Sequence, residues 1–307
     1  MVQSFGARTF QAVALSTANT SCAAPSTVDP CVKISEKLYV PPSDVLACYK
    51  AFPFSEALRQ NVLTNIARVF DFFTFEEYYL NSPPPFQEST TDIRKTLERI
   101  NSTKYETDYD FNKDLFDFTT QLNDGHTRPH NTFLFLVMDA DPIMLTGWWP
   151  DCYTIFQNLL PTPIINIEEN GVQGVYIAFD IVELFTQLGP EYSDYFDSIG
   201  FDWKRLQGAK VLEIEGQDPY AYVDHVAKTI SGNYLDHGIR VNSVFSSYRI
   251  SSGGVFSQRV GDLAGPWSVD QDSMTFKLIT INSTTAETVK VPFLASYLGA
   301  PFTDKDS

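Results

Sequence analysis

The sequence predicts an α+β protein in which a helical N-terminal domain is followed by a β-rich domain. Apolar residues recur at helical spacing along residues 55–122, whereas from Phe133–Met138 onward they form short extended runs. Hydrophobic residues make up 43% of the chain and aromatic residues 14%, which excludes a disordered chain. We expect a leader or extended segment over residues 1–30, a helical domain over 31–131 and a mixed, β-rich domain over 132–307.

The first helical elements are predicted from the cysteines. Pro41-Pro42 lies between Cys31 and Cys48, so two short helices that fold back at this bend bring the two thiols together. The cysteine spacing includes no CxxC and no neighbouring histidine pair, which favours a disulfide over a metal site. A Cys31–Cys48 bond leaves Cys22 and Cys152 as a second candidate pair, although four cysteines permit three connectivities.

Three longer helices follow. The first covers Ser55–Phe73 with its first residue as N-cap, the second begins after Thr90 or Thr91, and the third begins near Asp108. We expect the third to stop at Gly125, which suits the left-handed position after a helix. Aromatic side chains along 70–79 could line a lipid pocket, but at helical spacing we expect them to fill the core.

The second half contains strand patterns and one clear helix. Strands are predicted at Phe133–Met138, Gly174–Ala178 and Gly208–Gly216 because the runs are short and bounded by turn residues. Asp218-Pro219 opens a helix. The final pattern predicts a hairpin that pairs Met274, Phe276 and Leu278 with Val289 and Val291 across a polar turn.

The charge balance excludes some partners. The chain has 307 residues, with 22 Lys plus Arg against 38 Asp plus Glu, which gives a formal net charge of −16. Nucleic acid and anionic membrane surfaces would be repelled, so we expect neither as a partner. No apolar run approaches the roughly 18 to 20 residues of a spanning helix, and the short run Phe10–Leu15 follows only one cation, Arg8, and does not predict a cleavable signal.

Glycosylation sequons indicate an extracellular or secreted protein. They occur at Asn19, Asn101 and Asn282, each in a Ser/Thr-rich or turn-like segment, and a disulfide would fit the same environment. The alternative is chance, because short sequons recur in Ser/Thr-rich chains.

His126 is the candidate catalytic residue. It lies in Asn123–Thr127, directly after a predicted helix and before a predicted strand, so it can be held on ordered structure while facing a cleft. An imidazole with its ordinary pKa of about 6.5 suits a general base, although a loop histidine is more often a hydrogen-bonded surface residue. His130 follows four residues later, but Arg128-Pro129 prevents a regular helix, so we predict neither a metal site nor a cofactor.

Several segments together resemble the tail-specific, or C-terminal-processing, serine protease family, which includes the tricorn core and the retinoid-binding-protein repeats. The similarity is closest to its large secreted fungal branch and covers most of residues 31–305. It is carried by Tyr105–Thr127 with its Gly-His-Thr end, Cys31 and Cys48 around a helical pair, Ser82–Pro85, and Gly208–Pro219.

The resemblance implies a helical domain, a PDZ-like segment over about 206–295, and an α/β core that supplies a nucleophilic serine. In tricorn-type members a histidine of the helical domain is the base, and His126 matches it. The family's serine follows a strand and a glycine-rich segment, which we do not find before Ser307; Ser251–Gly254 has the pattern of a turn. The PDZ-like segment has no clear carboxylate-binding loop, and residues 231–272 are long for a connection.

The resemblance predicts that this chain is the portion of a secreted serine endopeptidase that does not carry the nucleophile. It would supply His126 as the general base and a domain that controls substrate access. Its partners would be a peptide or protein substrate and a C-terminal catalytic core of the same family, in the same precursor or as a separate chain. The alternative is a non-catalytic ligand-binding, peptide-binding or scaffold protein derived from that family. A metal-dependent hydrolase is disfavoured because ligand spacing is missing.

Overall fold

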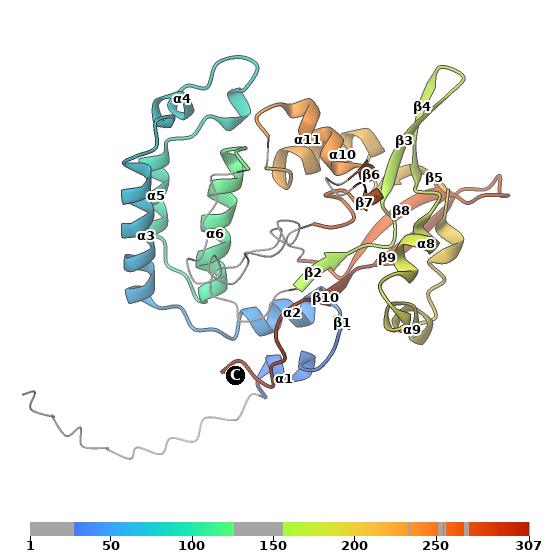
Figure 1. The fold of residues 1–307 in the computed structure, drawn as a ribbon, viewed down its shortest axis with the longest axis horizontal. Coiled ribbons are helices and arrows are strands. Elements are labelled where there is room, and N and C mark those ends of the chain that lie inside the picture. Colours follow the sequence, from blue (N-terminus) through green and yellow to red (C-terminus); the bar gives the residue numbers. More distant parts are fainter. Residues whose placement is uncertain are drawn as a thin grey trace, which may run out of the picture.

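The computed structural model describes residues 28–125, 156–232, 234–250, 254, 256–266 and 270–306, and these ranges confirm the α+β class. Figure 1 shows the helical half on one side of the molecule and the sheets on the other. The strand predicted at Phe133–Met138 lies outside the described residues.

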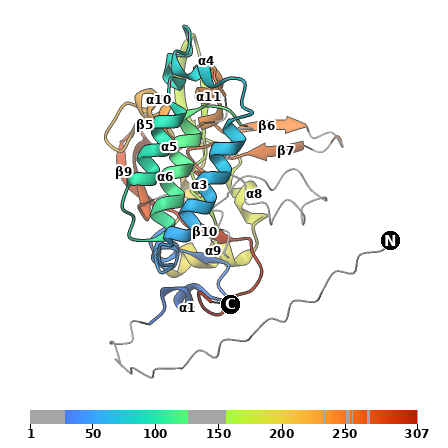
Figure 2. The same ribbon diagram turned by 90° about the vertical axis from the view of Figure 1, so that its left-hand side faces the viewer.

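The helical half contains a bundle of three long helices, α3, α5 and α6, which stand side by side (Figures 1 and 2). Its elements are α1 (Pro30–Ile34), β1 (Tyr39–Val40), α2 (Pro42–Tyr49), α3 (Glu56–Phe70), α4 (Glu76–Leu80), η1 (Gln87–Ser89), α5 (Ile93–Ser102) and α6 (Asp108–Gln121). The bundle encloses an apolar core built from one stripe of each helix, including Leu63, Leu97, Phe111, Leu115 and Leu122.

The structure confirms some of the predicted helix ends and corrects others. Ser55 caps α3 as expected, because its side chain accepts a hydrogen bond from the amide of Leu58. The predicted cap of α5 was wrong: Asp92, rather than Thr90 or Thr91, accepts from the amide of Lys95. At the end of α6 the left-handed residue is Asn123, with φ of 53°, and not Gly125.

The aromatic run after α3 only partly fills the core. Phe70 and Tyr79 are buried as expected. Phe72 and Phe75 are instead exposed, and both lie in the short connection between the end of α3 and the start of α4. The prediction that these two side chains fill the core was wrong.

The β-rich half begins with a strand that joins a small sheet and then builds a larger one. Its elements are β2 (Phe156–Leu159), β3 (Ile164–Glu169), β4 (Val172–Ile177), α8 (Ile181–Thr186), α9 (Pro190–Ser198), η2 (Lys204–Leu206), β5 (Lys210–Ile214), α10 (Pro219–Thr229), α11 (His237–Val244), β6 (Ser247–Ile250), β7 (Phe256–Arg259), β8 (Ser273–Ile279), β9 (Glu287–Pro292) and β10 (Leu294–Tyr297).

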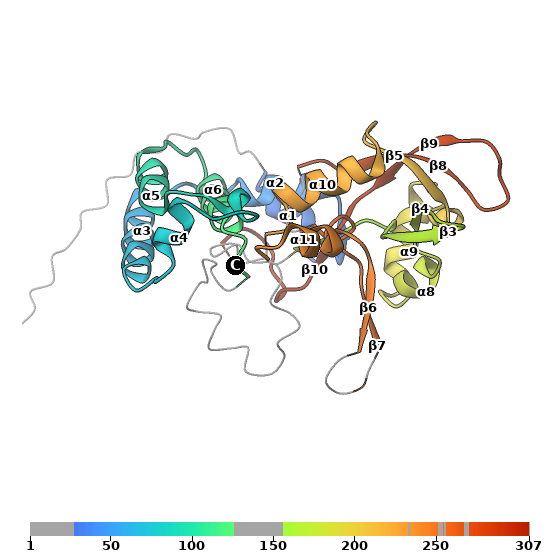
Figure 3. The ribbon, with the colours of Figure 1, turned by 90° about the horizontal axis from the view of Figure 1, so that it is seen from above.

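The larger sheet is antiparallel throughout, in the order β3-β4-β5-β8-β9. The predicted hairpin is confirmed: Met274 lies opposite Val291 and Phe276 opposite Val289, whereas Leu278 lies opposite Glu287. Two of the strands, β3 and β4, precede the segment 206–295. The long stretch 231–272 contains α11 and the separate hairpin β6–β7, which projects from the body of the molecule (Figure 3).

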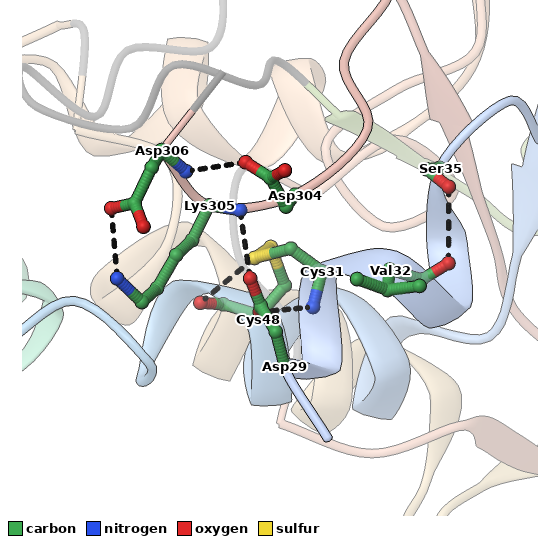
Figure 4. Close-up of a disulfide and its surroundings, with 8 residues drawn as sticks. All are labelled: Asp29, Cys31, Val32, Ser35, Cys48, Asp304, Lys305 and Asp306. Carbon is green, nitrogen blue, oxygen red and sulfur yellow. Dashed lines mark hydrogen bonds and ion pairs between the residues drawn. A yellow bond between two sulfur atoms is a disulfide. The ribbon is translucent and has the colours of Figure 1, made fainter. Parts of the chain in front are cut away.

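A three-stranded sheet, β1-β10-β2, joins the two halves. β1 comes from the N-terminal half and β10 from the last part of the described chain, and they pair antiparallel. Beside this sheet the disulfide Cys31–Cys48 connects α1 and α2, as predicted, and both cysteines are buried. Asp29 accepts hydrogen bonds from the amides of Cys31 and Lys305, each at 2.9 Å, so the disulfide helices also hold the C-terminal residues (Figure 4).

Candidate functional site

The turn that follows α6 is the described segment that directly precedes the predicted base in the sequence. His126 itself lies outside the described residues, as do His130, Cys22, Cys152 and Asn19. The turn is ordered by Asn123, whose amide donates to the hydroxyl of Ser89 at 2.9 Å and to the carbonyl of Gln121 at 3.2 Å. Asn123 and Ser89 are both buried. The direction in which the chain leaves α6 is therefore set by a contact with η1.

The last turn of α6 also touches the β-rich half. Gly232, in the turn after α10, approaches Thr120 so closely that a Cβ on the glycine would lie 2.2 Å from Thr120 Cγ2 and 2.5 Å from its carbonyl oxygen. Only a residue without a side chain allows this approach. Leu235, a few residues on, packs against the core of the bundle. The turn before residue 126 consequently lies where the two halves of the molecule meet.

A buried arginine strengthens this junction. Arg240 of α11 is 1% exposed, and its guanidinium donates to the carbonyls of Ala227, Tyr234 and Leu235 at 2.9 to 3.1 Å. It also forms an ion pair with Glu88, which precedes Ser89 in η1. Burial lowers the pKa of the guanidinium, and Glu88 opposes that effect. The arginine thus connects the β-rich half to the element that holds Asn123.

His237 belongs to the same cluster. Its Nε2 lies 2.7 Å from Asp224 Oδ1, and its Nδ1 lies 3.3 Å from both Glu88 Oε2 and Arg240 Nη2. A hydrogen bond from Lys228, followed by the contact with His237, holds the pKa of Asp224 below its usual range. Within the described ranges no hydroxyl or thiol is hydrogen-bonded to this imidazole. The arrangement orients His237 but offers it no nucleophile to activate.

The edge of the larger sheet at β3 is the place where a peptide could be added as a further strand. Part of this edge is already used by the chain. The amide of Ser246 donates to the backbone carbonyl of Ile164, the first residue of β3, at 2.8 Å. Any added peptide would therefore have to pair with the outer part of β3.

The other candidate residues are distributed away from this junction. Asn101 is exposed on the last turn of α5, and Asn282 is exposed in the turn between β8 and β9. The weak serine-glycine cluster at 251–254 is described only at Gly254. No group of three or more potential metal ligands occurs among the residues the structure describes.

Sequence reasoning missed the cluster of Glu88, Asp224, His237 and Arg240. Arg240 stands between apolar neighbours in a short helix, and no local pattern indicates that a cation there is buried. Its partner Glu88 is 152 residues away in the chain, so the pairing depends on tertiary contacts alone.

No protein-family model matches this chain, and no curated protein sequence matches it. In the described residues there is also no helix with the length and apolar character needed to cross a membrane.

Proposed function

We propose that this chain supplies the non-nucleophile portion of a secreted serine endopeptidase of the tail-specific type, with His126 as the general base. One observation carries the proposal: the turn that precedes His126 is held by the Asn123–Ser89 hydrogen bond and lies where α6 meets Gly232 of the β-rich half. A histidine that directly follows this turn would be able to act as base on a substrate bound between the helical half and the β-rich half. The buried Cys31–Cys48 disulfide supports an oxidising, extracellular environment.

The proposed chemistry is acyl transfer. His126 would take the proton from a serine hydroxyl as that oxygen attacks the peptide carbonyl, and would then give the proton to the leaving amine. Glu88, Ser89 and Asn123 would act as positioning residues, because together they fix the turn that carries the base. The nucleophile and the oxyanion donors would come from the C-terminal catalytic core of the same family, in the same precursor or as a separate chain.

The proposal is tested on material from the native source with a fluorophosphonate, a reagent that labels activated serines. We expect the label on a serine outside residues 1–307, and we expect purified 1–307 to be unlabelled and inactive on peptides. In the assembly with the serine-bearing partner, His126→Ala should lower kcat by roughly 10² to 10⁴. His225→Ala is the matched control, since His225 is exposed on α10 and should leave the rate unchanged.

Two outcomes would contradict the proposal. A labelled serine inside 1–307 would place the nucleophile in this chain. The absence of any serine-bearing partner or extension would favour the alternative, a non-catalytic binding or scaffold protein of the same descent.

A further inference from the structure

Three large apolar side chains are exposed between the last turn of α3 and the start of α4. Val69 is 68% exposed, Phe72 88% and Phe75 60%. The amide of Phe72 donates to the carbonyl of Val69 at 3.1 Å, and the Phe75 ring stands edge-on to that of Phe73, with centroids 5.8 Å apart. Phe73 is itself half-buried on the bundle core. We call Val69, Phe72 and Phe75 the α3–α4 patch.

The patch is large enough to be one side of a small interface. A phenylalanine buries roughly 150 to 250 Å² when it is fully enclosed, so the two rings leave a few hundred Å² of apolar surface in water. The largest apolar patch on a typical monomer is about 300 to 600 Å² and is often functional. A patch of this size can form the apolar centre of an interface to which each partner contributes roughly 800 Å², the remainder being polar rim.

The charges beside the patch are self-complementary. Arg68 on α3 and Glu77 on α4 carry opposite charges, and neither side chain forms an ion pair or hydrogen bond with another residue of the described chain. In a two-fold symmetric pair, each contact between two different residues occurs twice. Arg68 of one copy can then face Glu77 of the other copy at both ends of the interface.

A lipid surface fits the same patch poorly. Apart from Arg68, the charged residues between 68 and 80 are Asp71, Glu76 and Glu77, all acidic. Anionic membranes attract clusters of lysine and arginine, which this segment does not have.

We propose that the α3–α4 patch is a homodimer interface, in which Phe72 and Phe75 pack against their counterparts in a second copy and Arg68 pairs with Glu77 across the two-fold axis. The location supports this, because α3 and α4 lie at the outer edge of the helical half, away from the sheets (Figures 1 and 2).

Sedimentation velocity of the full chain tests the proposal over a concentration series from the low micromolar to the millimolar range. We expect the mass to rise from 34.6 kDa towards twice that value. Phe72→Ser together with Phe75→Ser should weaken dimerisation at least tenfold while leaving the melting temperature of the dilute, monomeric protein unchanged, because both side chains are exposed in the single copy. Val172→Ser is the matched control, since Val172 is 69% exposed but lies on β4.

Charge reversal provides a second, independent measurement. Arg68→Glu alone and Glu77→Arg alone should each weaken the dimer, because each places like charges opposite one another, and the double reversal should restore it. A chain that stays monomeric throughout the series, a dimer insensitive to the two serine substitutions, or patch-dependent co-sedimentation with phosphatidylcholine vesicles would each overturn the proposal.

Discussion

Asn123 makes two contributions at the end of α6. Its backbone adopts the left-handed conformation that most residues avoid, and its side chain satisfies the buried hydroxyl of Ser89. A glycine could provide the first contribution but not the second. The residue therefore couples the direction of the chain to the position of η1.

The substitutions Asn123→Ala and Asn123→Gly separate these contributions. Asn123→Ala should reduce the free energy of unfolding by about 2 to 4 kcal/mol. The left-handed backbone is unfavourable for alanine, and the substitution leaves the buried hydroxyl of Ser89 without its hydrogen-bond partner. Asn123→Gly should cost only the unpaired hydroxyl, about 1 to 2 kcal/mol. Urea unfolding followed by circular dichroism measures the free energy of unfolding of both variants. Equal losses of stability would show that the left-handed backbone conformation at residue 123 costs no energy.

At the scale of elements, α5 and α6 are tied by a charged cluster on the outside of the bundle. Arg99 donates to both carboxylate oxygens of Asp114 at 2.7 Å, and the hydroxyl of Tyr105 donates to the same carboxylate at 2.6 Å. Partial burial alone would raise the pKa of Asp114, but the hydrogen bonds from Arg99 and Tyr105 outweigh it and hold the pKa below its usual range. Burial, followed by the bond to Asp114, raises the pKa of Tyr105 to about 12.

This cluster should make the bundle sensitive to acid. Because the pKa of Asp114 is lower in the folded state, its stabilisation is complete above the unfolded value of about 3.9 and is lost as the pH falls through the folded value. Asp114→Asn should therefore lower the free energy of unfolding by about 1 to 2 kcal/mol at pH 7, and the difference from the native chain should shrink below about pH 4. Thermal melts at several pH values measure the stability difference between Asp114→Asn and the native chain. Asp117→Asn is the control, because Asp117 pairs with Lys113 on the exposed surface. A difference that does not vary with pH would refute the assignment.

The same elements show what the sequence can and cannot predict. The Ser55 cap, the start of α6 and the hairpin of β8 with β9 depend on signals within a few residues or on simple alternation, so they were predicted correctly. The cap of α5 is Asp92 and not Thr90 or Thr91 as predicted. Several adjacent residues have side chains that can cap a helix, and the geometry of the folded chain decides which one does. The contact between Gly232 and Thr120 and the burial of Arg240 arise from chain segments far apart, for which local patterns carry no information.

At the scale of the whole molecule, the residues that the structure describes join the two halves at two regions. One is the sheet β1-β10-β2 beside the disulfide, and the other is the junction of α6 and η1 with the turn after α10. The first fixes one end of the bundle and the second fixes the opposite end (Figure 1). Two separated attachments prevent the bundle from turning about either one.

Gly232→Ala should loosen the second attachment. The added methyl group would lie 2.2 Å from Thr120, so one half must shift and the chain should lose about 1 to 3 kcal/mol of stability. Hydrogen exchange should increase at the end of α6 and in η1 but not in β8–β9. Gly238→Ala is the control, because its added carbon would meet only the Asp236 side chain, at 3.1 Å. Uniform exchange changes across both halves would argue against a local junction.

The pairing of β1 with β10 also has a consequence for biosynthesis. Tyr39 lies opposite Ser296 in this pairing, so the ribosome completes β10 long after β1 has left the exit tunnel. At about 5 to 20 residues per second, that interval is on the order of ten seconds or more. The strand and the neighbouring α1 and α2 spend this time without the partner that completes their small sheet. The three-stranded sheet can thus close only after β10 has been synthesised, whereas the α3–α6 bundle, made from one continuous stretch, can fold earlier during synthesis.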